Sequence, residues 1–128
     1  MIEYACNRTR KGSEEMLFGG EKLKFEIQNE TMIVRVAGEI DHHSAVRARS
    51  EIDERILAER PKNVLLELSS VDFMDSSGLG LIMGRYALIR QFGGSLSVLD
   101  PSVAVLRIMK LAGMERIVPI KKTKEKKI

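Results

Sequence analysis

Apolar and polar residues alternate along two short stretches of the chain, which is the pattern of β-strands with one buried face. The alternating apolar positions are Leu23, Phe25 and Ile27, followed by Met32, Val34 and Val36. The polar sequence Gln28-Asn29-Glu30 separates the two stretches, and a short polar connection of this kind is typical of a hairpin. We therefore expect two antiparallel strands at the start of the regular part of the chain.

A helical period follows, in which apolar residues recur every three or four positions. From a start near His43, the apolar positions are Ala45, Ala48, Ile52 and Ile56. The charged residues between them are expected largely on the outer face: Arg47, Arg49, Glu51, Asp53 and Glu54. Pro61 ends this helix, and the nearly all-apolar stretch from Val64 to Leu68 then predicts a central strand covered on both faces.

The second half of the chain repeats the order of strand and helix. A helix is expected after Asp75, with its end at Gly93-Gly94, followed by a strand at Leu96 to Leu99. Apolar spacing over residues 105–112 predicts a third helix, and Ile117 to Ile120 predicts a short final strand. The order ββαβαβα(β) requires right-handed parallel crossovers. The predicted fold class is therefore α/β, a small mixed sheet of about four to five strands with helices packed against it.

The two ends of the chain lack this periodicity. A length of 128 residues fits one domain, which we place at residues 21–120. Residues 1–20 are expected to be a loosely ordered extension with a short strand near Ile2 to Ala5, and the alternatives for it are a disordered lead-in, an additional edge strand or a surface for a second partner. Residues 121–128 are expected to be a disordered, lysine-rich tail.

Charge and composition narrow the classes of function. The net charge is +3, but the tail alone holds five lysines and one glutamate, which leaves −1 for the rest of the chain. Without tryptophan or a basic stripe on a folded element, we expect no direct nucleic-acid contact. Cys6 is the single cysteine, and there is neither a signal peptide nor an apolar run of about 18 residues, so we expect a cytoplasmic protein without a membrane partner.

The sequence Asp75-Ser76-Ser77 lies where the central strand passes into the second helix. The first N–H groups of a helix have no internal partner, so a serine or aspartate oxygen can cap them and a phosphate is also accommodated there. From these residues alone, plain helix capping is the simpler interpretation and a phosphorylation switch is the alternative. Asp41 precedes the first helix in the same way, and we expect it to lie near Asp75.

Other chemistries have weaker support in the sequence. His42 and His43 are adjacent on a helix, where neighbouring side chains do not face each other, and no third ligand lies at metal-binding spacing. Gly78, Gly80 and Gly84 give GxGxxxG instead of the dinucleotide-binding GxGxxG, so close packing and a tight turn explain them better. Neither serine lies in a GxSxG or SxxK motif, and we therefore expect neither an enzyme nor a bound cofactor.

Three motifs together resemble a known family. They are Gly38-Glu39-Ile40-Asp41-His42-His43-Ser44-Ala45, then Phe73-Met74-Asp75-Ser76-Ser77-Gly78-Leu79-Gly80, then Gly84-Arg85-Tyr86. Their order and spacing resemble the anti-sigma factor antagonists of the STAS superfamily, most closely the sporulation type, from about Leu23 to Pro119. The resemblance implies that Ser76 is the phosphorylation site and that Ser77 is only its neighbour. It also implies partner-binding residues in both motifs, namely Asp41, His42, Asp75, Ser77, Gly78, Leu79 and Gly80.

The function implied by this resemblance is a phosphorylation-controlled switch. The unphosphorylated form would bind an anti-sigma factor that is also a serine kinase, and would thereby release a sigma factor. Phosphorylation at Ser76 would abolish this binding, and a serine phosphatase acting on phospho-Ser76 would restore it. ATP would be bound by the kinase, so this chain would need no cofactor. The alternatives are a STAS adaptor in a larger signalling assembly, a domain of a membrane transporter, and a nucleotide-binding protein, and no oligomeric state is implied.

Overall fold

The computed structural model describes residues 13–18 and 21–123, and all of its strands belong to one sheet. The six strands lie in the order β1-β2-β3-β4-β5-β6. The strands are β1 (Ser13–Phe18), β2 (Glu21–Gln28), β3 (Thr31–Ile40), β4 (Asn63–Met74), β5 (Ser95–Leu99) and β6 (Ile120–Lys121). The helices are α2 (His42–Glu59), α3 (Ser76–Gln91) and α4 (Val103–Leu111), with a 3₁₀ turn η1 at Met114–Arg116.

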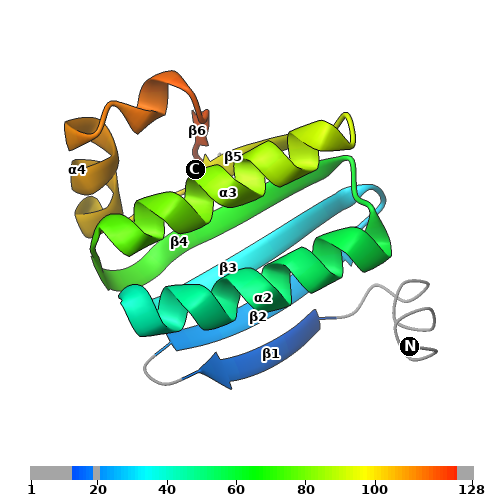
Figure 1. Cartoon of the computed structure of the whole chain (residues 1–128), viewed down its shortest axis with the longest axis horizontal. Coiled ribbons are helices and arrows are strands. Elements are labelled where there is room, and N and C mark those ends of the chain that lie inside the picture. Colours follow the sequence, from blue (N-terminus) through cyan, green and yellow to red (C-terminus); the bar gives the residue numbers. More distant parts are fainter. Residues whose placement is uncertain (1–12, 19–20, 124–128) are drawn as a thin grey trace.

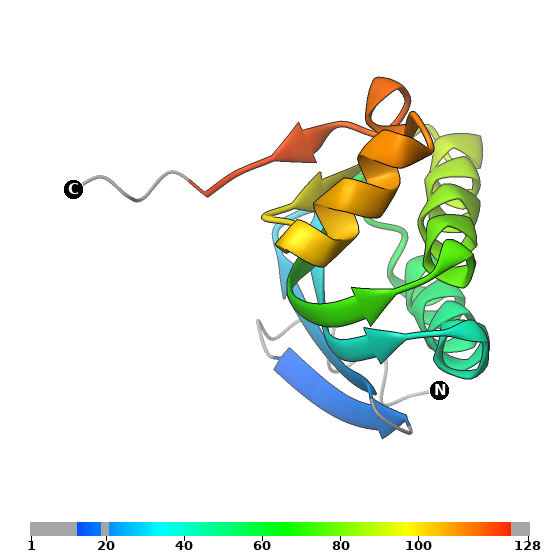
Figure 2. The same cartoon turned by 90° about the vertical axis from the view of Figure 1, so that its left-hand side faces the viewer.

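The sheet is mixed, so the predicted fold class is confirmed. The first three strands are antiparallel neighbours, and β3, β4, β5 and β6 are parallel. Helices α2 and α3 lie side by side over one face of the sheet (Figure 1), and the side view in Figure 2 places both on the same side of the strands. No helix in the described ranges has the length and apolar character needed to span a membrane.

The predicted apolar positions form the core between the sheet and this pair of helices. The hairpin strands bury Leu23, Phe25, Met32, Val34 and Val36, while Ile27 is half-buried. Helix α2 buries Ala45, Ala48, Ile52 and Ile56, as its spacing predicts. The alternating and helical periods of the sequence are therefore sufficient to identify the inner face of each of these elements.

Strand β4 is longer than the apolar run that predicts it, and it is irregular along its contact with β3. Arg35 pairs with Glu67 and Ile40 pairs with Met74, so five steps along β3 correspond to seven steps along β4. Two separate register shifts accommodate the extra residues. Ile40 and Met74 are both buried at the carboxyl ends of these strands, next to the starts of α2 and α3.

Both ends of the domain differ from the sequence-based expectation. A strand, β1, lies within residues 1–20 and pairs with β2, which corresponds to the edge-strand alternative for this stretch. The strand predicted near Ile2 to Ala5 lies outside the described residues. The final strand is shorter and later than predicted, because the N–H groups of Ile117 and Val118 both donate to the carbonyl of Met114 and keep this segment in a turn.

Candidate functional site

The N-terminal ends of α2 and α3 are neighbours, since they follow two parallel strands that are paired to their last residues. Ile40 lies opposite Met74, and the Asp75 N–H donates to the Ile40 carbonyl at 3.2 Å. Asp41 and Asp75 come directly after this pair, and each is the N-cap of the helix that follows. The two cap residues are therefore neighbours in space, as expected for Asp41 and Asp75.

Asp41 forms a reciprocal capping box with Ser44. Its carboxylate accepts the Ser44 N–H at 3.0 Å, and the Ser44 hydroxyl oxygen accepts the Asp41 N–H at 3.0 Å. The hydrogen bond from the Ser44 N–H is the main reason why the pKa of Asp41 lies below its ordinary value. Asp41 is therefore held as an anion at the rim of the site, with its orientation fixed by α2.

Asp75 caps α3 in the same way, without use of the Ser76 side chain. The Asp75 carboxylate accepts the Ser77 N–H at 2.8 Å, while Ser76 is the first residue of the helix and is exposed. The Ser76 hydroxyl has no hydrogen-bond partner in the part of the chain that the structure describes. Of the two candidate caps, Asp75 is used, and the hydroxyl of Ser76 remains available to solvent.

The three glycines of this region have different surroundings. Gly78 is buried, and a Cβ atom placed on it would lie 2.2 Å from Met74 Cγ, so close packing explains this glycine. A Cβ atom on Gly80 or Gly84 would meet nothing within 4 Å, so close packing is wrong as an explanation for these two positions. Leu79 is half-buried and packs against the core. Gly80 is exposed and leaves bare backbone at the surface of α3.

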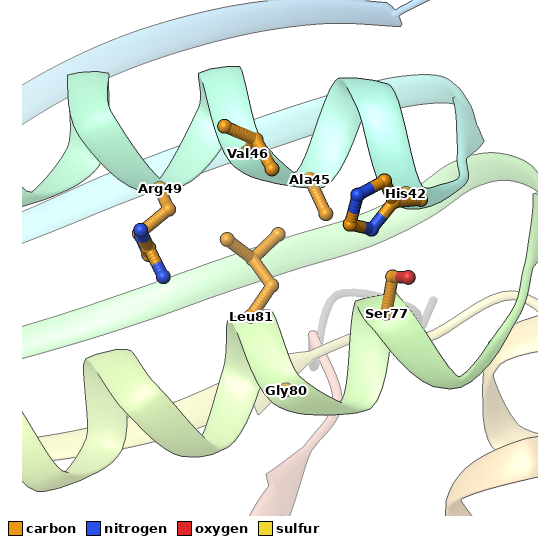
Figure 3. Close-up of a pocket in the computed structure, with 7 residues that line it drawn as sticks. All are labelled: His42, Ala45, Val46, Arg49, Ser77, Gly80 and Leu81. Atoms are coloured by element: carbon orange, nitrogen blue, oxygen red, sulfur yellow. The ribbon is translucent and has the colours of Figure 1, made fainter.

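A hollow of about 240 Å³ lies between α2 and α3 beside these residues (Figure 3). Three residues predicted for partner binding line it, namely His42, Ser77 and Gly80. Sequence reasoning missed the other four lining residues, which are Ala45, Val46, Arg49 and Leu81. His42, Val46 and Arg49 are spaced by four and three residues, which places them on one side of a helix. The core-facing residues of the same helix have similar spacing, so the sequence alone does not identify this side as the lining of a hollow.

The rings of His42 and His43 approach each other, contrary to the expectation that adjacent helical side chains point apart. Their centroids are 5.9 Å apart and the planes are nearly perpendicular, at 82°. Both side chains are exposed at the start of α2. Within residues 13–18 and 21–123, no three histidine, cysteine or acidic side chains gather as a metal site would require.

A buried ion pair connects α2 and α3 below the hollow. Arg85 Nε lies 2.6 Å from Asp53 Oδ1, and the Arg85 side chain is only 7% exposed. Burial lowers the pKa of Arg85, the Asp53 carboxylate opposes this effect, and the charge of Arg49 adds to it. Asp53 was expected on the outer face, but its side chain is 31% exposed and turned toward α3.

Comparison with known proteins assigns this arrangement to a class. The sequence matches the STAS domain over residues 22–127. The chain therefore belongs to the STAS domain family, in agreement with its fold and with the motifs around Asp41 and Ser76. This match includes all of the site described above.

Several of the similar proteins are named anti-sigma factor antagonists. An anti-sigma F factor antagonist of Paenibacillus polymyxa is 40% identical over 99 residues, which cover 77% of this chain and 85% of the relative. The anti-sigma factor antagonist SpoIIAA in its unphosphorylated form superposes with a TM-score of 0.70 at 27% identity, over 80% of this chain and 89% of that one. The Bacillus cell fate determinant SpoIIAA in the phosphorylated form gives a TM-score of 0.65 at 27% identity, over 80% and 92% of the two chains.

Proposed function

We propose that this chain is a cytoplasmic anti-sigma factor antagonist of the SpoIIAA type and not an enzyme. In the unphosphorylated state it captures an anti-sigma factor and so releases a sigma factor for transcription. The observation that carries this proposal is the position of Ser76, which is exposed where two helix N-termini and their capping aspartates meet, and whose hydroxyl has no hydrogen-bond partner among the described residues. The named similarity to antagonists, including one described both with and without phosphate, supports the same function.

Phosphorylation of Ser76 is the proposed control of this binding. A phosphoserine adds about −1.5 to −2 charges at neutral pH, and free N–H groups at a helix start can donate hydrogen bonds to the phosphate oxygens without disruption of the helix. At the surface, the phosphate joins Asp41 and Asp75 in one dense negative patch. Like-charge contact at an interface costs several kcal/mol, and about 2.8 kcal/mol already weakens binding about a hundredfold. The modification therefore acts on the partner more than on the fold.

The proposed partners are the anti-sigma factor, which is itself the ATP-dependent serine kinase, and a phosphatase that removes phosphate from Ser76. ATP and its metal ion belong to the kinase. The surface offered to the kinase comprises the exposed Ser76 and the groups around it, with Asp41 fixed by Ser44 and Gly80 bare on α3. Gly78 and Leu79 contribute mainly through packing that holds this surface in place.

The test is a binding titration with the purified anti-sigma factors of the source organism. We expect one of them to bind the unmodified chain and to lose at least about a hundredfold in affinity when Ser76 is phosphorylated. Ser76→Ala should bind whether or not kinase and ATP are present. Ser76→Asp should mimic the phosphate only in part because it carries less charge. Asp41→Asn should weaken capture while the far-ultraviolet circular dichroism stays that of the wild type.

Ser77→Ala is the matched control, because it removes a hydroxyl one residue away and keeps the cap that Asp75 provides through the backbone. Intact-mass and peptide mass spectrometry after incubation with ATP and the kinase should find one phosphate on wild type and on Ser77→Ala, and none on Ser76→Ala. Equal affinity of the phosphorylated and unmodified chains would refute the charge mechanism. Absence of binding to every anti-sigma factor would favour an adaptor function for this STAS domain.

A further inference from the structure

The hollow between α2 and α3 is an open surface feature, with apolar residues in the middle of its lining and polar residues at its ends. Val46 is 49% exposed beside it, although it is a large aliphatic residue, and Ala45 and Leu81 form deeper parts of the lining. Gly80 adds no side chain on the α3 side. A volume of about 240 Å³ corresponds to several water molecules, at about 30 Å³ each in the liquid, so the hollow can hold a whole side chain.

Arg49 gives one end of the hollow a positive charge. Its side chain extends from α2 toward the gap between the helices, whereas His42 and Ser77 lie at the other end (Figure 3). Arg49 is exposed and forms no ion pair or hydrogen bond through its side chain in the described part of the chain. The nearby carboxylate, Asp53, is already occupied by the buried Arg85. These three side chains therefore hold two positive charges and one negative charge.

We propose that the anti-sigma factor inserts an apolar side chain into this hollow and sets an aspartate or glutamate carboxylate against Arg49. This inference rests on the proposed function and deepens it by assigning the chemistry of the partner's segment. The apolar lining favours an aliphatic or aromatic side chain, because its burial removes both surfaces from water. A carboxylate balances the excess positive charge and matches the planar donor geometry of a guanidinium.

The two ends of the hollow then have different roles in partner binding. The end at His42 and Ser77 adjoins the phosphorylation site, where the charge changes with the state of the switch. The end at Arg49 keeps the same charge in both states, so it determines which partner is recognised. Arg49 and Val46 are thus specificity-determining residues, and they act without contact with the phosphorylated hydroxyl.

The first test compares Arg49→Glu with Arg47→Glu in titrations against the anti-sigma factor that binds the wild-type chain. Both substitutions reverse one exposed arginine of α2, but Arg47 does not line the hollow. We expect at least about a tenfold weaker affinity for Arg49→Glu and less than about a threefold change for Arg47→Glu at the same salt concentration. Thermal unfolding of both variants checks that the fold is kept.

The second test compares Val46→Ser with Leu57→Ser. These aliphatic residues of α2 are 49% and 48% exposed, and only Val46 lines the hollow. We expect Val46→Ser to weaken binding several-fold more than Leu57→Ser. Equal effects within either pair of variants would overturn the proposal while the wild-type chain still binds, and failure of the wild type to bind any anti-sigma factor would overturn the proposed function as well.

A charge exchange identifies the opposing group. Each aspartate and glutamate of the anti-sigma factor is changed to lysine in turn, and every variant is titrated against wild type and Arg49→Glu. One of these changes should weaken binding to wild type and restore at least about tenfold of the affinity for Arg49→Glu. If no change gives this restoration, the carboxylate contact is refuted.

Discussion

The ion pair between Arg85 and Asp53 leads to a sharp prediction about stability. In Asp53→Asn the side chain keeps its size and shape but loses its charge. The Arg85 side chain, which is 7% exposed, then remains buried with no opposing charge at 2.6 Å, and its contact with the Leu81 carbonyl, at 3.4 Å, is too long to replace the lost interaction. The substitution thus isolates the cost of an unbalanced buried cation between α2 and α3.

The size of this cost follows from the geometry. Two unit charges at 2.6 Å attract each other by about 6 kcal/mol at an effective dielectric constant of about 20, before the cost of desolvation. Loss of one partner of a fully buried pair costs about 3–5 kcal/mol. Because the Asp53 side chain is 31% exposed, water partly screens the pair, and we expect the free energy of unfolding to fall by about 2–3 kcal/mol.

The assay is urea unfolding at neutral pH, followed by circular dichroism. The expected loss lowers the midpoint by about 1–2 M, at the slopes usual for a chain of this size. Glu54→Gln is the control, since it removes the charge of the next residue of α2, which is exposed, and should change stability by less than about 0.5 kcal/mol. The reasoning fails if Asp53→Asn and Glu54→Gln unfold at the same urea concentration with the same slope.

Three further predictions concern residues around the proposed phosphorylation site. Gly80→Ala and Gly84→Ala should each raise the free energy of unfolding by about 0.5–1 kcal/mol, measured by urea titration, because a methyl group meets nothing there and favours the helix; a loss of stability would contradict the open surroundings of these glycines. Gly78→Ala should instead lower it by about 1–2 kcal/mol in the same assay, since its Cβ overlaps Met74, and an unchanged midpoint would show that Met74 moves aside easily. The pKa of Asp41 lies below its ordinary value of 3.8, so the contribution of this carboxylate to stability is present above that pH and is lost as the pH falls through the lowered pKa. The free energy of unfolding of Asp41→Asn, measured by urea titration, should therefore decline less steeply in acid than that of the wild type. Parallel curves of unfolding free energy against pH for the two proteins would refute this.

Local patterns in the sequence were sufficient for most of the sheet and for the position of the caps at the starts of α2 and α3. The alternation ending at Val36 and the apolar run from Val64 identify strands, and Asp75 is a cap because it follows a strand and precedes a helical period. The adjacency of Asp41 and Asp75 also follows from the sequence, because parallel neighbouring strands end at the same edge. These features depend on interactions between residues that are near in sequence or on simple topology.

Features that depend on how α2 and α3 pack together could not be obtained in this way. From the sequence alone, Asp53 is expected to face outward, because the pattern of α2 does not show that Arg85 of α3 lies beside it. Val46 and Arg49 likewise appear as ordinary surface residues of α2, and only the spacing of the two helices makes them the lining of a hollow. The sequence predicts a strand such as β1 only as one of several alternatives for residues 1–20, because the pairing with β2, and not a pattern of its own, defines this strand.

The irregular pairing of β3 with β4 has a consequence for changes in chain length. Each of the two extra residues of β4 lies in a bulge of its own, where two adjacent exposed residues, 69–70 or 72–73, separate the buried residues Leu68, Val71 and Met74. Deletion of one residue of either exposed pair would remove one bulge and leave Met74 buried opposite Ile40. The bulges therefore allow β4 to change its length by single residues while the direction in which Ser76 is presented stays the same.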